Sequence, residues 1–195
     1  MGEWRPAVFG PPQSFVLDAE VYELAGSWQV LLEWLPAERW HMHVLYGLLH
    51  PLDADRLSDR LDDGEDPLTR EEVRAVAERL VQQATGHKWW VAQRLYATLA
   101  ASWAELDGQL SLRGVELAAL LPAPARACNL VYAWLVDGAD EQGRRRLDMQ
   151  LTRPPAGMTK RQAAGAWSPQ EQGRAFMDAY RAQGDAGGRS PARVA

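Results

Sequence analysis

Apolar residues recur along most of the chain at the spacing of one helix face. Trp28, Leu31 and Leu35 show this spacing in the first such segment, and Ser27 precedes them as a candidate N-cap. Proline and glycine separate the segments from one another. The pattern predicts helices over residues 28–35, 37–49, 53–62, 69–85, 87–106, 123–136 and 140–151, with a loop and a short helix over 110–121.

The clearest start of a helix is the capping box formed by Thr69 and Glu72. The Thr69 side chain is placed to accept a hydrogen bond from the amide at position N3, while Glu72 reaches back to the N-cap amide. Gly86 is a suitable end for this helix, since glycine readily adopts the left-handed conformation of a C-terminal cap. Both ends of this helix are therefore predicted from local chemistry.

Before the first helix, the apolar positions alternate with a period of two. Phe15 and Leu17 precede the polar segment 18–20, and Tyr22 and Leu24 follow it. This alternation around a polar turn predicts a small β-hairpin. Because two strands alone are only marginally stable, we expect the hairpin to pack on the helices.

These elements predict a mainly α fold: a bundle of short helices with a small N-terminal β-hairpin and a flexible C-terminal tail. We expect an extended N-terminal arm over residues 1–13 and the helical domain with its hairpin over 14–157. Residues 158–195 are expected to hold a C-terminal helix, which begins at Ser168, and then a flexible basic tail that is rich in glycine.

The composition is that of a globular protein, except for its tryptophan content. The chain has 195 residues, of which 9 are Trp and only 3 are Phe. We expect most of the tryptophans to form the core and one to three to serve an interaction surface. Trp89 and Trp90 point about 100° apart on a helix, so one is expected in the core and the other near the surface. This pair is a candidate partner-binding site.

The net charge of −5 is the sum of an acidic segment and a basic end. Residues 53–66 hold 7 acidic and 2 basic residues, whereas residues 144–195 hold 10 basic and 4 acidic ones. These regions are either solvated faces or an electrostatic docking surface. The strongest basic run, Arg144, Arg145 and Arg146, is a second candidate partner-binding site. Because these arginines spread over about 200° of a helix, they do not favour nucleic-acid binding.

The residue types that carry chemistry do not form a reactive constellation. His43 and His50 would lie about 10 Å apart on a helix, too far to share one metal ion. A calcium loop that begins at Asp59 would need glutamate at position 12, where the chain has Arg70. The single Cys128 lies in an apolar helix and is expected to fill the core. We therefore expect no enzymatic activity, no catalytic or metal-binding residue and no cofactor.

Two features predict a cytosolic protein. No run of 18 residues is free of charge, so a membrane span is not expected. The first residues contain no apolar core of a signal peptide.

Three stretches resemble the tail assembly chaperones of long-tailed, siphovirus-type phages that infect actinobacteria. They are the hairpin with residues 28–40, the segment 43–51, and above all the segment 126–158. The resemblance implies a protein of the host cytoplasm that binds the tape measure protein, keeps it soluble and assists tail assembly. It also implies a second partner, a frameshifted longer form that shares the N-terminal domain. The family has no fixed functional residues, so none is assigned here.

Other functions remain open at this point. The chain could be a structural protein of the virion, such as a head–tail connector, or a small helical enzyme or nucleic-acid-binding adaptor. A molecule with separated acidic and basic regions can also associate head to tail with copies of itself.

Overall fold

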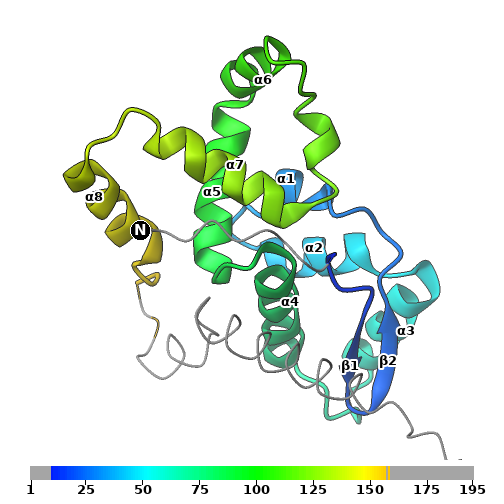
Figure 1. Ribbon diagram of the computed structural model, residues 1–195. Coiled ribbons are helices and arrows are strands. Elements are labelled where there is room, and N and C mark those ends of the chain that lie inside the picture. The colour runs from blue at the N-terminus through cyan, green and yellow to red at the C-terminus, as the bar shows by residue number, and fades with distance from the viewer. Residues whose placement is uncertain (1–9, 157, 159–195) are drawn as a thin grey trace, which may run out of the picture.

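The computed structural model describes residues 10–156 and 158, and it confirms the expected fold class. The described chain is mainly helical, with a two-stranded antiparallel hairpin near its N-terminal end (Figure 1). The first nine residues of the expected arm lie outside the described residues, as do the expected C-terminal helix and basic tail. In chain order the elements are β1 (Ser14–Leu17), β2 (Glu20–Glu23), α1 (Val30–Trp34), α2 (Trp40–Leu48), α3 (Pro51–Asp62), α4 (Arg70–Thr85), α5 (Trp89–Ala101), α6 (Trp103–Ser111), the 3-10 helix η1 (Ala118–Leu120), α7 (Pro124–Val136) and α8 (Glu141–Thr152).

The hairpin forms where the alternation of apolar residues predicts it. Phe15 of β1 pairs with Tyr22 of β2, and their rings stack with 5.1 Å between centroids. Asp18 and Ala19 form the turn with φ angles of 50° and 64°. Positive φ angles at both turn residues match the right-handed twist of the two strands, so this tight turn sets the register.

The hairpin is joined to α2 by backbone contacts. Leu24 forms a β-bridge with Leu49, and the amide of Gly26 donates to the Leu48 carbonyl over 2.8 Å. A Cβ atom on Gly26 would lie 2.0 Å from the carbonyl oxygen of Gly47. The close approach of these two backbones therefore requires glycine at position 26.

Several predicted helix boundaries are wrong. Helix α2 begins at Trp40 and not at residue 37, α3 begins at Pro51 and not at residue 53, and α6 ends at Ser111 and not at residue 106. Helix α1 begins at Val30 and not at residue 28, because Ser27 accepts from the Gln29 amide in a turn that precedes the helix. The predicted helix over 87–106 is two helices, α5 and α6, which meet at Ser102 (φ −109°, ψ 20°). No glycine or proline lies at this break, so nothing in the local sequence predicts it.

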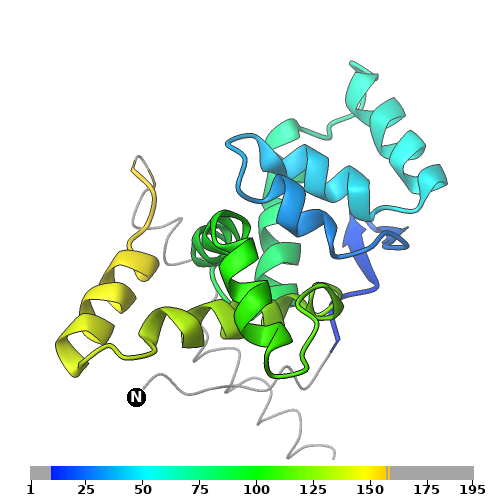
Figure 2. The same cartoon turned by 90° about the horizontal axis from the view of Figure 1, so that it is seen from above.

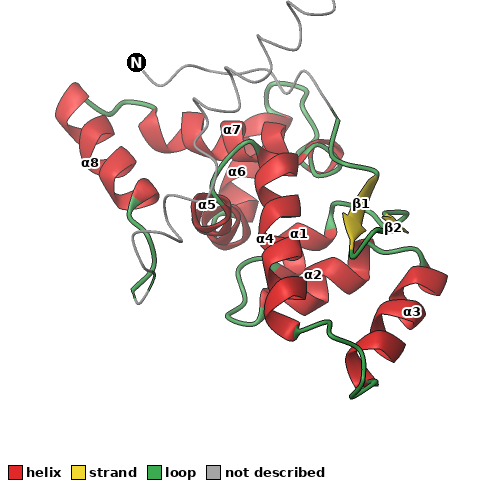
Figure 3. Cartoon of the chain, turned by 90° about the horizontal axis from the view of Figure 1, so that it is seen from below, coloured by secondary structure: helices red, strands yellow, loops and turns green. Residues whose placement is uncertain are grey.

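Helix α5 lies at the centre of the bundle. It contacts α1, α4, α6, α7 and α8 (Figure 1, Figure 3). Because neighbouring helices cover α5 on most of its sides, its side chains are apolar on most of its sides. Each large side chain buried there stabilises the fold by about 1.5–3 kcal/mol. The side chains that α5 buries are Trp89, Trp90, Val91, Ala92, Leu95, Tyr96 and Leu99.

Candidate protein-binding surface

Trp89 and Trp90 are both buried, with 6% and 1% of their surfaces exposed. The expectation that one of them lies near the surface is therefore wrong. The reason is the central position of α5: Trp89 packs on Trp40 of α2, with 5.9 Å between ring centroids, while the Trp90 indole donates to the Thr152 carbonyl of α8. Neither side chain offers a contact surface to a partner in the described structure.

The other tryptophans in residues 10–156 divide between the core and its edge. Trp28 and Trp40 are buried, whereas Trp34, Trp103 and Trp134 are half-buried. Trp34 stacks on His43 with 4.2 Å between ring centroids. Trp134 is the one described tryptophan that lines the groove between α6 and α7, so it is placed for an intermolecular contact.

The groove lies between α6 and α7 and has a volume of about 310 Å³. Its apolar lining comes from leucines on both helices and from Trp134, and its polar rim comes from Arg113 and Gln109 on the α6 side and Asp137 after α7. We call this feature the α6–α7 groove. Its lining residues are Leu106, Gln109, Leu110, Arg113, Leu130, Ala133, Trp134 and Asp137.

Two exposed apolar residues follow the end of α6. Leu112 has 89% of its surface exposed, the highest value among the large apolar residues of the described chain, and Val115 has 38% exposed. Neighbouring Leu110 is only half-buried. A groove with an apolar lining and a few polar groups at its edge has the character of a binding site.

Arg144, Arg145 and Arg146 are all exposed on α8. Arg145 pairs with Glu141 one turn earlier on the same helix. The run is not brought together with the tryptophan pair, because Trp90 contacts the opposite end of α8 at Thr152. The two candidate sites therefore do not form one surface.

Polar contacts hold the C-terminal half of helix α8 to the bundle. The Tyr132 hydroxyl of α7 donates to Asp148 over 2.8 Å, and burial, together with this carboxylate, raises the pKa of Tyr132 to about 12. Near the C-terminal end, Arg94 donates to the carbonyls of Gln150 and Leu151 over 2.7 and 2.6 Å. A cation at the last carbonyls of a helix is favourable, because it offsets their partial negative charge.

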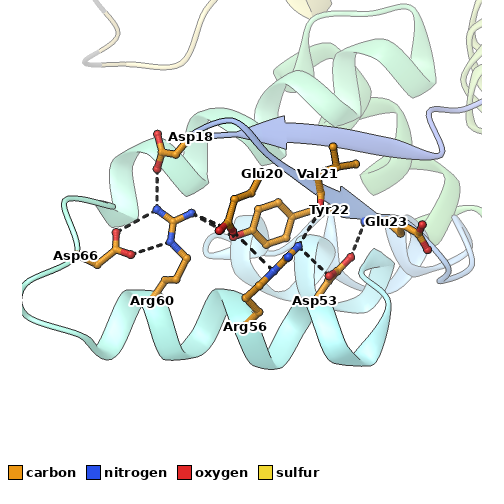
Figure 4. Close-up of polar contacts among 9 residues, drawn as sticks. All are labelled: Asp18, Glu20, Val21, Tyr22, Glu23, Asp53, Arg56, Arg60 and Asp66. Carbon is orange, nitrogen blue, oxygen red and sulfur yellow. Dashed lines mark hydrogen bonds and ion pairs between the residues drawn. The ribbon is translucent and has the colours of Figure 1, made fainter.

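Part of the acidic segment is engaged within the chain. Asp53 and Asp66 belong to an ion-pair network that joins α3 to the hairpin (Figure 4). The Arg60 guanidinium donates to both carboxylate oxygens of Asp66, over 2.7 and 3.1 Å, and to Asp18 over 2.8 Å. Arg56 donates to the Val21 carbonyl over 2.7 Å. We call these contacts, with Asp53 and Tyr22, the hairpin–α3 network.

The network shifts the pKa values of Arg60 and Asp66 in the direction that stabilises their charged forms. Hydrogen bonds to Asp66, then to Tyr22 and Asp18, raise the pKa of Arg60. The Arg60 hydrogen bond, with one from the Leu68 amide, lowers the pKa of Asp66. The network joins the hairpin to α3 through charge-assisted hydrogen bonds, so it contributes to the stability of the fold.

The histidines and the cysteine occupy structural positions. His41 contacts Glu78 over 3.3 Å, and His50 caps α3 by accepting from the Leu52 amide. Cys128 is buried in the core, as expected, and this burial raises the pKa of its thiol. Burial also disfavours the charged form of His87 and so lowers its pKa, although a hydrogen bond with Asn129 opposes this shift.

The residues that the structure describes lack two features. They contain no group of three or more His, Cys, Asp or Glu side chains that could hold a metal ion. None of the helices in residues 10–156 is both long and apolar enough to span a membrane.

Comparisons with protein-family models, with curated proteins and with solved structures found no match to this chain. A function for this chain is therefore inferred from the site itself and from the sequence resemblance.

The groove was missed at the sequence level, although a signal for it exists. Leu130 and Trp134 have i, i+4 spacing on α7, and Leu106 and Leu110 have the same spacing on α6. Such pairs indicate an apolar face but do not say whether another helix covers it. Here the two faces border a groove, and Trp134 stays partly exposed.

Proposed function

We propose that this chain is a non-catalytic tail assembly chaperone that binds an apolar helical segment of a tape measure protein and keeps that protein soluble. The observation that carries the proposal is the α6–α7 groove, whose apolar lining comes from leucines on both helices and from Trp134. An amphipathic helix binds such a groove through apolar residues that are three or four positions apart.

The polar rim supports binding of a peptide segment in a defined orientation. Arg113 and Asp137 lie on the two sides of the groove and carry opposite charges. Charges at the rim of an apolar site contribute more to orientation and association rate than to affinity. The groove is therefore suited to a client helix with an apolar face and flanking charges of both signs.

The sequence resemblance supports the same function. Its most telling stretch, residues 126–158, includes Leu130 and Trp134, which line one side of the groove. By the same resemblance, the protein acts in the host cytoplasm and has a frameshifted longer form of itself as a second partner.

The test is co-expression with the tape measure protein of the same phage. Ala133 lines the groove and is exposed, so Ala133→Arg would fill the groove without removing a core contact. We expect the wild-type chain to bring the tape measure protein into the soluble fraction and Ala133→Arg to reduce its recovery about tenfold. Ala75→Arg, at an exposed position of α4, is the matched control and should behave as the wild type.

Two outcomes would contradict the proposal. Equal recovery with Ala133→Arg and with Ala75→Arg would exclude the groove as the binding site. Detection of the chain by mass spectrometry in purified virions, at the level of a structural component, would favour a virion protein such as a head–tail connector.

A further inference from the structure

The side of α8 that faces away from the bundle carries arginines around one exposed methionine. Leu151 is buried against the bundle, which places Arg145, Arg146 and Met149 on the outward side. The Met149 side chain has 65% of its surface exposed. The ion pair of Arg145 with Glu141 is exposed and lies within one helix, so it is weak. Arg145 can therefore leave Glu141 and pair with a carboxylate of another molecule.

The outward side of α3 has the same arrangement with the opposite charge. Leu57 is buried against the bundle, which places Asp55, Asp59 and Asp62 outward, all of them exposed. Leu52 lies beside them with 72% of its surface exposed. None of these three carboxylates forms an ion pair with a residue in the described part of the chain.

The two arginines of α3 do not neutralise this acidic stripe. Arg60 is engaged by Asp18 and Asp66, and Arg56 by Asp53 and the hairpin (Figure 4). Both guanidinium groups are therefore directed toward the hairpin and away from the outward face of α3.

Helices α3 and α8 lie at opposite ends of the molecule, as all three ribbon views show (Figures 1, 2 and 3). A face of α8 cannot reach the α3 face of its own chain, but it can reach that of a second copy. We infer that copies of this chain associate head to tail, with Arg145, Arg146 and Met149 of one copy packed on Asp55, Asp59 and Leu52 of the next.

The geometry fixes the type of assembly. Two different faces are used, so the contact is heterologous and leaves one face free at each end, which allows a chain to grow. Two short helices bury less than the roughly 800 Å² per partner of a stable interface. We therefore expect weak association that depends on protein concentration and that salt weakens.

The experiment is sedimentation velocity of the full chain over a range of concentrations, at roughly 0.02 M and roughly 0.5 M salt. Wild type should form a concentration-dependent series of oligomers at low salt. Arg145→Glu with Arg146→Glu, or Asp55→Lys with Asp59→Lys, should each weaken self-association about tenfold or more, because like charges then face each other.

Mixing distinguishes this arrangement from a symmetric dimer. The two double variants each retain one native face, and their two reversed faces are complementary in charge. Together they should therefore form alternating oligomers that grow, whereas a symmetric dimer would remain a dimer. The fourfold variant, with both faces reversed, should recover self-association. Rescue in the fourfold variant also shows that the loss in each double variant does not come from misfolding.

Charge-matched controls lie at exposed positions outside both faces. Glu33→Lys with Glu116→Lys, and Arg79→Glu with Arg126→Glu, should leave self-association unchanged. A wild-type chain that stays monomeric at low salt would overturn the inference, as would oligomers that the face variants do not affect. Binding of duplex DNA through Arg145 and Arg146 by a chain that remains monomeric would assign the basic face to nucleic acid instead. The measurement uses the chain alone, so its failure would leave the client-binding proposal untouched.

Discussion

At the residue scale, Arg60 is the side chain on which the attachment of α3 to the hairpin depends most. Its guanidinium contacts Asp66 through both carboxylate oxygens, and it also reaches Asp18 and Tyr22. A planar group with several fixed donors can make these bonds together, whereas the ammonium group of lysine cannot reproduce their geometry. One side chain thus joins a helix, a turn and the loop that follows the helix.

This network predicts a specific dependence of stability on pH. The pKa of Asp66 lies below its ordinary value of 3.8 in the folded chain, chiefly because of its hydrogen bond with Arg60. The charged carboxylate therefore stabilises the fold above about pH 4, and this contribution is lost as the pH falls through the lowered pKa. We expect Asp66→Asn to reduce the melting temperature at pH 7 but to differ little from wild type near pH 2.

Thermal unfolding followed by circular dichroism at the two pH values measures this difference. Asp59→Asn is the control, because this exposed side chain makes no ion pair with a described residue. An Asp66→Asn variant that is equally destabilised at both pH values would show that the charge of the carboxylate is not responsible.

At the element scale, both ends of α4 match the prediction, because each is set by side chains close to it in the sequence. Thr69 and Glu72 form the expected capping box, and Gly86 ends α4 in the left-handed conformation at φ 72°. By contrast, the break at Ser102 has no local signal. A capping side chain acts within four residues, so it can be recognised in the sequence alone.

The capping box of α4 is a measurable contribution to stability. Thr69→Ala removes the hydroxyl that accepts from the Glu72 amide and that donates to the Glu72 carboxylate over 2.8 Å. We expect the free energy of unfolding in urea to fall by about 1 kcal/mol. Gln83→Ala, at an exposed position of the same helix, should change it by only a few tenths of a kcal/mol. Equal effects of the two substitutions would contradict a capping role.

Helix α8 should depend on Arg94 for its attachment. Arg94 donates to two carbonyls near the end of α8, and burial, with the nearby Arg153, lowers the pKa of Arg94. We expect Arg94→Ala to leave these carbonyls without their cation and to speed amide hydrogen exchange in residues 141–152 severalfold, with α4 unchanged. Arg79→Ala, at an exposed position, serves as the control. Unchanged exchange in α8 would show that its apolar contacts alone hold it.

At the scale of the whole molecule, the hairpin is held to the bundle because the backbone at Gly26 packs directly on the backbone of α2 at Gly47 and Leu48. The strand passes the end of α2 so closely that Leu24 pairs with Leu49 and the Gly26 amide donates to Leu48. Together with the hairpin–α3 network, this contact fixes the hairpin from two sides. The acidic outer face of α3 therefore has a defined position relative to α8, which head-to-tail association requires.

One substitution made at two glycines should have opposite effects. A Cβ atom at Gly26 would lie 2.0 Å from the Gly47 carbonyl oxygen and 2.8 Å from the Leu48 Cα atom, so Gly26→Ala must push two backbones apart. We expect a loss of about 1–3 kcal/mol in the free energy of unfolding. Gly108 lies within α6 with open space around it, and Gly108→Ala should add about 0.5–1 kcal/mol. Denaturation in urea measures both, and a neutral Gly26→Ala would contradict the close approach.

The sequence by itself determined the fold class, the hairpin and most helices. Each of these follows from local chemistry: the alternation from Phe15 to Tyr22, the capping box at Thr69, and the glycine at position 86. Apolar periodicity also identified core residues such as Leu31 and Leu35 correctly. These features arise from interactions within a few residues along the chain, which is why they can be recognised without a tertiary structure.

Only the tertiary structure decided which apolar and charged side chains are covered. Both Trp89 and Trp90 are buried because α5 is covered by helices from before and after it in the chain, and the Trp90 indole donates to a carbonyl 62 residues away. Arg60 is engaged by Asp18, 42 residues away, whereas Asp55 of the same acidic segment stays exposed. The α6–α7 groove likewise depends on how two helices meet. Periodicity shows that a helix has an apolar or a charged face, but the partner of that face is chosen by contacts between distant segments of the chain.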